Sequence, residues 1–308
     1  MSVLKIIVIA GPTASGKSGL ALELAKELNG VIINADSMQV YRDIPILAAA
    51  PSDDDKVVAP HRLYGIYDAS IHGNMMDWLI LCRQEITAAR KDRRIPIVVG
   101  GTGLYLETLI KGASPIPETP AEIRKEVAEN LKRHGLAFLY EELKKVDESS
   151  AARLSANDTT RIRRALEVYY HTHKTMTYWQ TQPLRQFYSR DEFVNVYINP
   201  RRDELDCRCR MRFDKMVELG AVEEARRLLL RNLPNSLPAM HALGVQEFKA
   251  YFEGECLMDE AIEQAKLHTR QYAKRQATWF NNRFDGDLMY KACFEQDKNF
   301  VDAVKKAL

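Results

Sequence analysis

The feature that most constrains the fold is an eight-residue, glycine-rich segment close to the N-terminus. It reads GPTASGKS over residues 11–18 and matches the pattern G-x-x-x-x-G-K-[ST] of a phosphate-binding loop. A short β-branched run precedes it at residues 4–10, and residues 19–28 follow with helical spacing. In such a strand-loop-helix unit, backbone N–H groups converge on phosphate oxygens at the helix N-terminus, where the helix dipole also favours an anion. The sequence therefore predicts a site for a di- or triphosphate.

Two side chains of this loop carry the chemistry that a phosphate site needs. Lys17 would place a positive charge on the outer phosphate, and the Ser18 hydroxyl would bind Mg²⁺. The predicted phosphate-binding residues are Gly11, Pro12, Thr13, Ala14, Ser15, Gly16, Lys17 and Ser18.

The pattern of apolar runs predicts an α/β protein with a P-loop NTPase-like core, in which helices flank a parallel sheet. Short apolar runs alternate with helical segments, and we expect strands at residues 4–10, 31–34, 95–99 and 193–198. Three prolines at 115, 117 and 120 break this pattern, and a charged, helical block follows. We expect a catalytic core over 1–117 and 190–308, with an all-helical insertion over 118–189. After Pro200 we expect only helices, over 204–230, 245–252 and 259–281.

Composition excludes several broad classes. The chain has 308 residues, of which 46% are hydrophobic and 28% charged, so it can bury a core and is not disordered. No apolar run approaches the roughly 20 residues of a membrane span, and no secretory signal is present, so we expect a cytoplasmic protein. The five cysteines are scattered and are predicted to be reduced thiols that bind no metal. We also expect a monomer.

The position of the acids argues against an ordinary NTPase. Such enzymes carry a Mg²⁺-binding acid after a second apolar strand, but residues 95–99 run into GGTGLY without one. Instead, Asp36 follows the strand at 31–34, at the sheet edge where ligands bind in α/β proteins. Asp36 can be a metal or structural ligand or a general base. Thr102 can likewise belong to a bare turn or to a polar wall of the site.

A basic, aromatic segment lies near the C-terminal end. Residues 264–284 contain five lysines and arginines and no acid, interleaved with tyrosine, tryptophan and phenylalanine. This composition suits a surface that tracks a phosphodiester backbone and stacks on bases. It also suits a solvated basic helix face whose aromatic side chains point into the core.

Taken together, these motifs resemble the tRNA dimethylallyltransferase (tRNA isopentenyltransferase) family over most of the chain. The most specific matches are GPTASGKS at 11–18, INADSMQVYRD at 33–43, PIVVGGTGLYL at 96–106, NDTTRIRRALEVY at 157–169 and TRQYAKRQATWF at 269–280. The resemblance implies transfer of a dimethylallyl group from dimethylallyl diphosphate to N6 of adenosine 37, in tRNAs that read codons beginning with U. It also implies a helical insertion that swings over the anticodon stem-loop, and Mg²⁺ as cofactor.

The resemblance assigns roles to individual residues. Thr13 would hydrogen-bond the bridging oxygen as the C–O bond breaks, Lys17 would hold the diphosphate, and Asp36 would be the general base for the N6 proton. Arg208 and Arg212 match arginines of which one faces the diphosphate. Gln39 would read the edge of the flipped adenine. The implied tRNA-binding residues are Asp36, Ser37, Met38, Gln39, Thr102, Arg124, Thr160, Arg161, Ile162, Arg163, Arg164, His241, Gly244, Lys274, Arg275, Gln276 and Trp279.

The chain departs from the family pattern in three places. Leu47-Ala-Ala-Ala50 stands where the family has a Thr-Ala-(Lys/Arg) run, which loses a polar pair. Thr172-His173 replaces Thr-Gly, and Gly244-Val245 replaces Gly-Tyr. The alternatives are therefore an adenylate isopentenyltransferase that acts on free AMP, ADP or ATP, a P-loop small-molecule kinase, and an RNA-binding protein that has lost catalysis.

Overall fold

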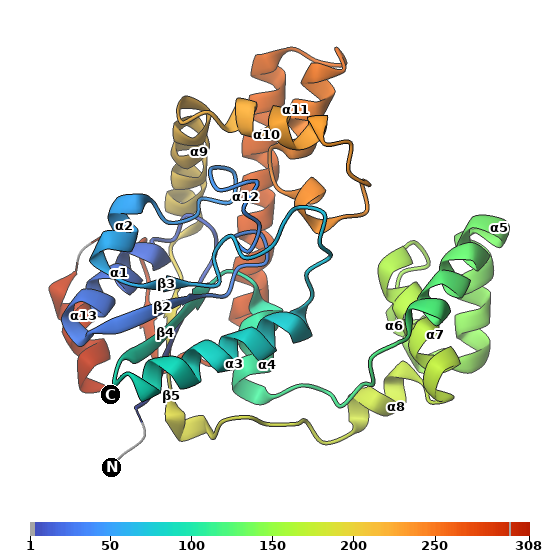
Figure 1. The fold of residues 1–308 in the computed structure, drawn as a ribbon, viewed down its shortest axis with the longest axis horizontal. Coiled ribbons are helices and arrows are strands. Elements are labelled where there is room, and N and C mark those ends of the chain that lie inside the picture. The colour runs from blue at the N-terminus through green and yellow to red at the C-terminus, as the bar shows by residue number, and fades with distance from the viewer. Residues whose placement is uncertain (1–3, 296) are drawn as a thin grey trace. The chain divides into compact units, whose positions relative to one another are not determined.

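The chain divides into two compact units (Figure 1). The computed structural model describes residues 4–295 and 297–308. Unit 1 comprises the chain up to Ile110 together with residues 188–308, and unit 2 is the segment Lys111–Phe187. The sequence placed the same two borders at 117/118 and 189/190, so the proline-rich stretch lies within unit 2 rather than at its edge.

Unit 1 is built on a six-stranded, wholly parallel sheet with the order β3-β2-β4-β1-β5-β6. Its strands are β1 (Ile6–Ala10), β2 (Gly30–Asn34), β3 (His61–Arg62), β4 (Ile95–Gly100), β5 (Phe193–Ile198) and β6 (Leu288–Tyr290). The parallel sheet flanked by helices confirms the predicted fold class. The expectation of only helices after Pro200 is wrong, because β6 pairs with β5 at the edge of the sheet.

Helices cover both faces of this sheet (Figure 1). Alternate residues of β1 point to opposite faces and are all fully buried, which explains why the strand reads as an unbroken apolar run. Ile7 and Ile9 belong to the core beneath α1 and α13, while Trp78 of α3 donates its indole N–H to the Asn34 carbonyl at 2.7 Å. The flanking helices are α1 (Lys17–Leu28), α2 (Asp53–Val58), α3 (Met75–Lys91), α4 (Gly103–Lys111) and α13 (Lys298–Lys306).

A helical cluster packs above the carboxyl ends of the strands and shares a core with the loop at residues 38–49. The prediction of one helix over 204–230 is wrong: Gly220 adopts φ 101°, a left-handed conformation that glycine adopts readily, and breaks it in two. The cluster contains α9 (Arg202–Glu218), α10 (Ala221–Leu230), α11 (Val245–Phe252) and α12 (Met258–Arg283), with short 3₁₀ turns η1 (Arg190–Glu192) and η2 (Pro238–His241).

Unit 2 is all-helical and has its own core. Val127, Leu139, Leu143, Ile162 and Leu166 are buried within it. Its helices are α5 (Ala121–Val146), α6 (Glu148–Arg153), α7 (Thr159–Thr172) and α8 (Met176–Thr181).

The remaining sequence expectations concern membranes and thiols. Among the helices that the structure describes, none is long and apolar enough to cross a bilayer. All five cysteines are free. Cys207 is exposed and Cys209 is buried, so the two side chains point to different sides of α9 as their spacing indicated.

Candidate active site

The glycine-rich loop connects β1 to α1 at the carboxyl edge of the sheet. Gly16 adopts φ 89° immediately before α1, and in the described part of the chain no side chain caps this helix. The first N–H groups of α1 therefore point toward the loop, ready to bind an anion. A side chain at Gly16 would meet the backbone of Phe294 at 2.5 Å, so the segment after β6 forms one wall of the loop.

Two cations approach each other at this loop. Lys17 Nζ donates to the Pro12 carbonyl at 2.6 Å, and burial lowers the pKa of Lys17 to about 7, against the opposing effect of Asp36. Burial also lowers the pKa of the Arg212 guanidinium, and the positive charge of Arg212 further disfavours protonated Lys17. A bound diphosphate would reverse this effect because its negative charge stabilises both cations.

An outer cavity of about 780 Å³ opens beside the loop. Arg208 and Arg212 of α9 both line it, and Arg208 hydrogen-bonds the Glu295 carboxylate at its rim. Of the predicted diphosphate-binding residues, Ala14, Ser15, Gly16, Lys17, Ser18, Arg208 and Arg212 line this cavity.

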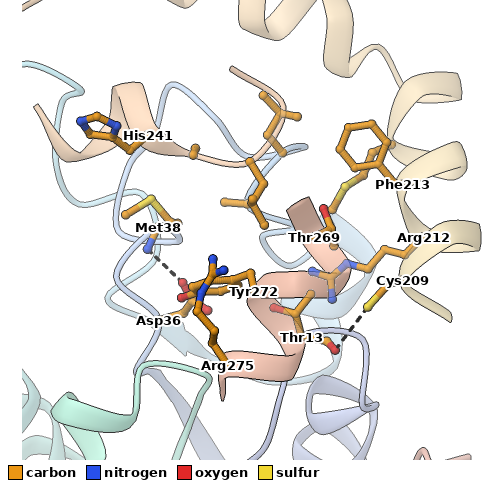
Figure 2. A pocket seen from close by; sticks show the side chains of 15 residues that line it. Thr13, Asp36, Met38, Cys209, Arg212, Phe213, His241, Thr269, Tyr272 and Arg275 are labelled. Carbon is orange, nitrogen blue, oxygen red and sulfur yellow. Dashed lines mark hydrogen bonds between the residues drawn. The ribbon is translucent and has the colours of Figure 1, made fainter. Parts of the chain in front are cut away.

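A second, inner cavity of about 300 Å³ lies on the other side of the loop (Figure 2). Arg212 points into it from α9, while Asp36 and Arg275 lie across from it. Arg212 lines both cavities, so the two meet at its guanidinium. The polar lining residues are Thr13, Asp36, Arg212, His241, Thr269, Tyr272 and Arg275, and the larger apolar ones are Met38, Leu47, Phe213, Met216 and Leu243.

Asp36 is held in a fixed orientation. Its Oδ1 accepts the Met38 N–H at 2.9 Å, and its own N–H donates to Asn34 Oδ1 at 2.8 Å. The buried Asn34 amide also donates to the Asp36 carbonyl at 3.0 Å. The carboxylate is thus fixed through one oxygen and faces the inner cavity from β2, while Thr13 faces it from the loop after β1.

The GGTG turn after β4 supports the Asp36 loop. Thr102 Oγ1 accepts the Ser37 N–H at 2.9 Å, and a side chain at Gly100 would lie 2.0 Å from the Ala35 carbonyl oxygen. The glycine is required because the ends of β2 and β4 approach so closely. Thr102 therefore forms part of the wall behind Asp36.

Four residues predicted to bind tRNA have different positions from those expected. Gln39 donates both hydrogen bonds of its amide to the Ala48 and Ala49 carbonyls, at 3.0 and 2.9 Å, and so supports the loop instead of facing the inner cavity. Ile162 is fully buried in the core of unit 2, and Gly244 is buried where a side chain would meet Leu47 at 2.7 Å. Gln276 is buried, and its amide is bound to Thr13 and Gly101.

Other predicted tRNA-binding residues are accessible. Lys274, Arg275 and Trp279 line a groove of about 530 Å³ on α12, and His241 is exposed at the inner cavity. In unit 2, Arg124, Thr160 and Arg161 are exposed, whereas Arg163 and Arg164 are partly buried and face the buried Glu167 carboxylate. Ser37 and Met38 are partly exposed beside Asp36.

The structure adds residues that the sequence did not single out. Tyr272 lines the inner cavity, and burial raises the pKa of its phenol. Its place four residues before Gln276 on the buried side of α12 is a helical signal that could have identified it. Glu204 and Glu295 line the outer cavity, and no local pattern indicates this because they come from distant segments.

The parallel sheet and the loop before α1 define a protein with a P-loop NTPase-like fold, whose anion site faces a carboxylate across a closed cavity. Comparison with known proteins then identifies the family. The model of the IPP transferase family matches residues 39–283. A tRNA dimethylallyltransferase of Zymomonas mobilis is 45% identical over 280 residues, which cover 91% of this chain and 88% of the relative. One from Bradyrhizobium sp. is 43% identical and covers 91% of both chains.

Solved structures agree with this assignment. A full-length tRNA isopentenylpyrophosphate transferase from Bacillus halodurans aligns with a TM-score of 0.69 and 32% identity, covering 98% of this chain and 95% of that one. A eukaryotic dimethylallyltransferase acting on tRNA aligns with a TM-score of 0.83 and 29% identity, covering 99% of this chain and 77% of that one. The chain belongs to the tRNA dimethylallyltransferase family of prenyl-transferring enzymes.

Proposed function

We propose that this chain transfers a dimethylallyl group from dimethylallyl diphosphate to N6 of adenosine 37, in tRNAs that read codons beginning with U. The observation that carries the proposal is the arrangement around Arg212. The phosphate-binding loop opens on the outer cavity, Asp36 faces the inner cavity, and Arg212 lies where they meet. The diphosphate would occupy the outer cavity, with the adenine in the inner one.

The side chains at this junction suit each part of the transfer. The C–O bond of dimethylallyl diphosphate breaks and its electron pair leaves with the diphosphate, whose charge Lys17 and Arg212 would stabilise. The Thr13 hydroxyl would donate to the bridging oxygen as charge develops there. N6 forms the new C–N bond and gives a proton to Asp36. The same groups serve direct displacement and a route through an allylic cation.

Mg²⁺ fits this site only together with the substrate. Within the described residues, no group of three or more histidine, cysteine or acidic side chains could bind a metal. Ser18 is exposed at the start of α1 and lines the outer cavity, so its hydroxyl would bind the ion while the diphosphate and water supply the other ligands. The ion would neutralise charge on the leaving diphosphate.

A macromolecular acceptor is favoured over free AMP, ADP or ATP. The groove on α12 is lined by Lys274, Arg275 and Arg283 together with Trp279, a set that suits phosphate contacts and base stacking. The exposed Thr160 and Arg161 in unit 2 offer a second polar surface. Loss of catalysis is not favoured, because Thr13, Lys17 and Asp36 are all present and surround the cavities. Since one chain supplies every lining residue, we propose that it acts as a monomer, in the cytoplasm.

The test is transfer of radiolabel from dimethylallyl diphosphate. The acceptors are an unmodified tRNA with adenosine at position 37, the same tRNA with guanosine there, and AMP. We expect label on the first acceptor alone. Label on AMP alone, on the guanosine variant, or on none of the three would refute the proposal.

A further inference from the structure

Gln276 of α12 joins the two sides of the inner cavity. We propose that it is a positioning residue: by bridging the phosphate-binding loop and the GGTG turn, it fixes the distance between Thr13 and Asp36. The proposal rests on the function proposed above. It gives this buried amide a role in catalysis instead of in tRNA binding.

Both ends of the Gln276 amide are used. Its Oε1 accepts the Thr13 N–H and its Nε2 donates to the Gly101 carbonyl, each at 2.8 Å. The backbone partners determine which end is which, because an N–H can only donate and a carbonyl can only accept. Gln276 is 6% exposed, so water competes little for either bond.

The GGTG turn is shaped to receive α12. A side chain at Gly101 would lie 2.4 Å from Gln276 Nε2, and one at Gly103 would lie 2.2 Å from the Trp279 ring. Two glycines of the motif therefore leave room for two α12 side chains, three residues apart on one helix face. The turn is in contact with α12 at both positions.

The same turn leads directly to Asp36. Thr102, between the two glycines, accepts the Ser37 N–H at 2.9 Å, and Ser37 is the neighbour of Asp36. On the other side, Thr13 bonds to Gln276 through the backbone of the very residue whose hydroxyl faces the cavity. Gln276 thus connects the proposed leaving-group residue to the proposed base through a short series of hydrogen bonds.

This geometry predicts a loss of rate without a loss of tRNA affinity. Thr13 and Asp36 must act on the two ends of one reacting carbon, and a displacement of about 1 Å can cost about 100-fold in rate. The side chains on the exposed face of α12 contact solvent, not this bridge, so RNA contacts made there persist when Gln276 is altered.

The experiment compares Gln276→Met, which removes both bonds at similar volume, with Gln276→Glu, which keeps the acceptor for Thr13 but loses the donor to Gly101. Gln264→Met, on the exposed face of the same helix, is the matched control. We measure kcat, the KM for each substrate, tRNA affinity, and amide hydrogen exchange of residues 11–18 and 100–103. A thermal melt confirms that each variant folds.

For Gln276→Met we expect kcat to fall about 30- to 100-fold, tRNA affinity to stay within about threefold, and amide exchange to rise in both segments. Gln276→Glu should keep the slow exchange of Thr13 and show a smaller loss of kcat. Unchanged kcat with weaker tRNA binding would overturn the proposal and restore Gln276 as an RNA contact. Unchanged exchange in both segments would also overturn it.

Two arms keep this inference separable from the function. If the wild type transfers no label to any acceptor, the proposed function fails, yet hydrogen exchange still tests the bridge. If Gln276→Met does not fold, Gln276→Asn replaces it, because the shorter side chain cannot reach both partners. Wild-type kcat in Gln276→Asn would then refute the positioning role.

Discussion

Asp36→Asn separates the chemistry of the carboxylate from its place in the fold. The Met38 N–H bonds to Asp36 Oδ1, and an asparagine offers the same acceptor. The loop should therefore keep its conformation, with less than about 1 kcal/mol lost from the free energy of unfolding. The substitution removes only the second oxygen and the negative charge, which a general base needs.

The expected loss of rate is large compared with that structural effect. General base catalysis contributes about 10²- to 10⁴-fold, or about 3 to 5 kcal/mol of activation free energy. Asp36→Ala should lose a similar factor in rate and, in addition, about 1 kcal/mol of stability, because the Met38 N–H then loses its acceptor. The two variants together distinguish the base from the turn.

The assay is single-turnover transfer from radiolabelled dimethylallyl diphosphate to a saturating anticodon stem-loop, with urea unfolding in parallel. Asp53→Asn, at an exposed carboxylate on α2, controls for the loss of one negative charge. Diphosphate affinity should stay equal or become tighter, since a nearby negative charge is removed. A rate for Asp36→Asn within threefold of the wild type would refute the assignment of Asp36 as base.

Three further outcomes follow from the structure. Lys274→Ala combined with Arg275→Ala should weaken tRNA binding and lower the slope of log K against log salt by about 2, while Arg226→Ala with Arg227→Ala on α10 should leave it unchanged; an unaltered slope in the first variant would exclude that face from RNA contact. Gly103→Ala should cost about 1 to 3 kcal/mol in urea unfolding, because the new methyl meets the Trp279 ring, whereas the same change at Gly254, where the space is open, tests backbone strain alone. Arg212→Met should raise the KM for dimethylallyl diphosphate at least tenfold, whereas Arg210→Met, exposed on the same helix, should not; equal KM values would remove Arg212 from the diphosphate site.

The sequence predicted the sheet because its strands are buried on both faces. Residues 6–10 and 193–198 are continuous β-branched and aromatic runs, and such runs indicate a parallel sheet covered by helices. β6 was missed because it has only three residues and carries no repeating pattern. The break at Gly220 was missed because apolar residues recur at helical spacing on both sides of it.

The site was predicted less completely, because a motif match gives a residue but not the direction of its side chain. Gln39 and Gln276 both lie in matching segments, yet both amides bind backbone groups inside the protein. For Gln276 the sequence does contain the missing signal. Residues 265, 269, 273, 276 and 280 are spaced as the buried stripe of one helix, so Gln276 falls on its inner side.

The departure at Leu47-Ala-Ala-Ala50 becomes understandable in the same terms. The backbone of this loop is held by Gln39 from one side, and by Glu224, which accepts the N–H groups of Ile46 and Leu47 at 2.9 and 2.8 Å, from the other. The loop conformation therefore does not depend on polar side chains at Ala48 or Ala50. What changes is the lining, because Leu47 and Ala48 give the inner cavity an apolar wall.

Helix α12 explains why the catalytic and RNA-facing features of this chain occur in one short motif. Along one turn and a half, Tyr272 lines the inner cavity, Gln276 bridges Thr13 and Gly101, and Lys274 and Arg275 face the groove. A rigid helix keeps these side chains at fixed spacing. An RNA backbone that binds the groove is therefore placed relative to the phosphate-binding loop by the same element that sets the loop against Asp36, so acceptor placement and the geometry of transfer depend on one helix.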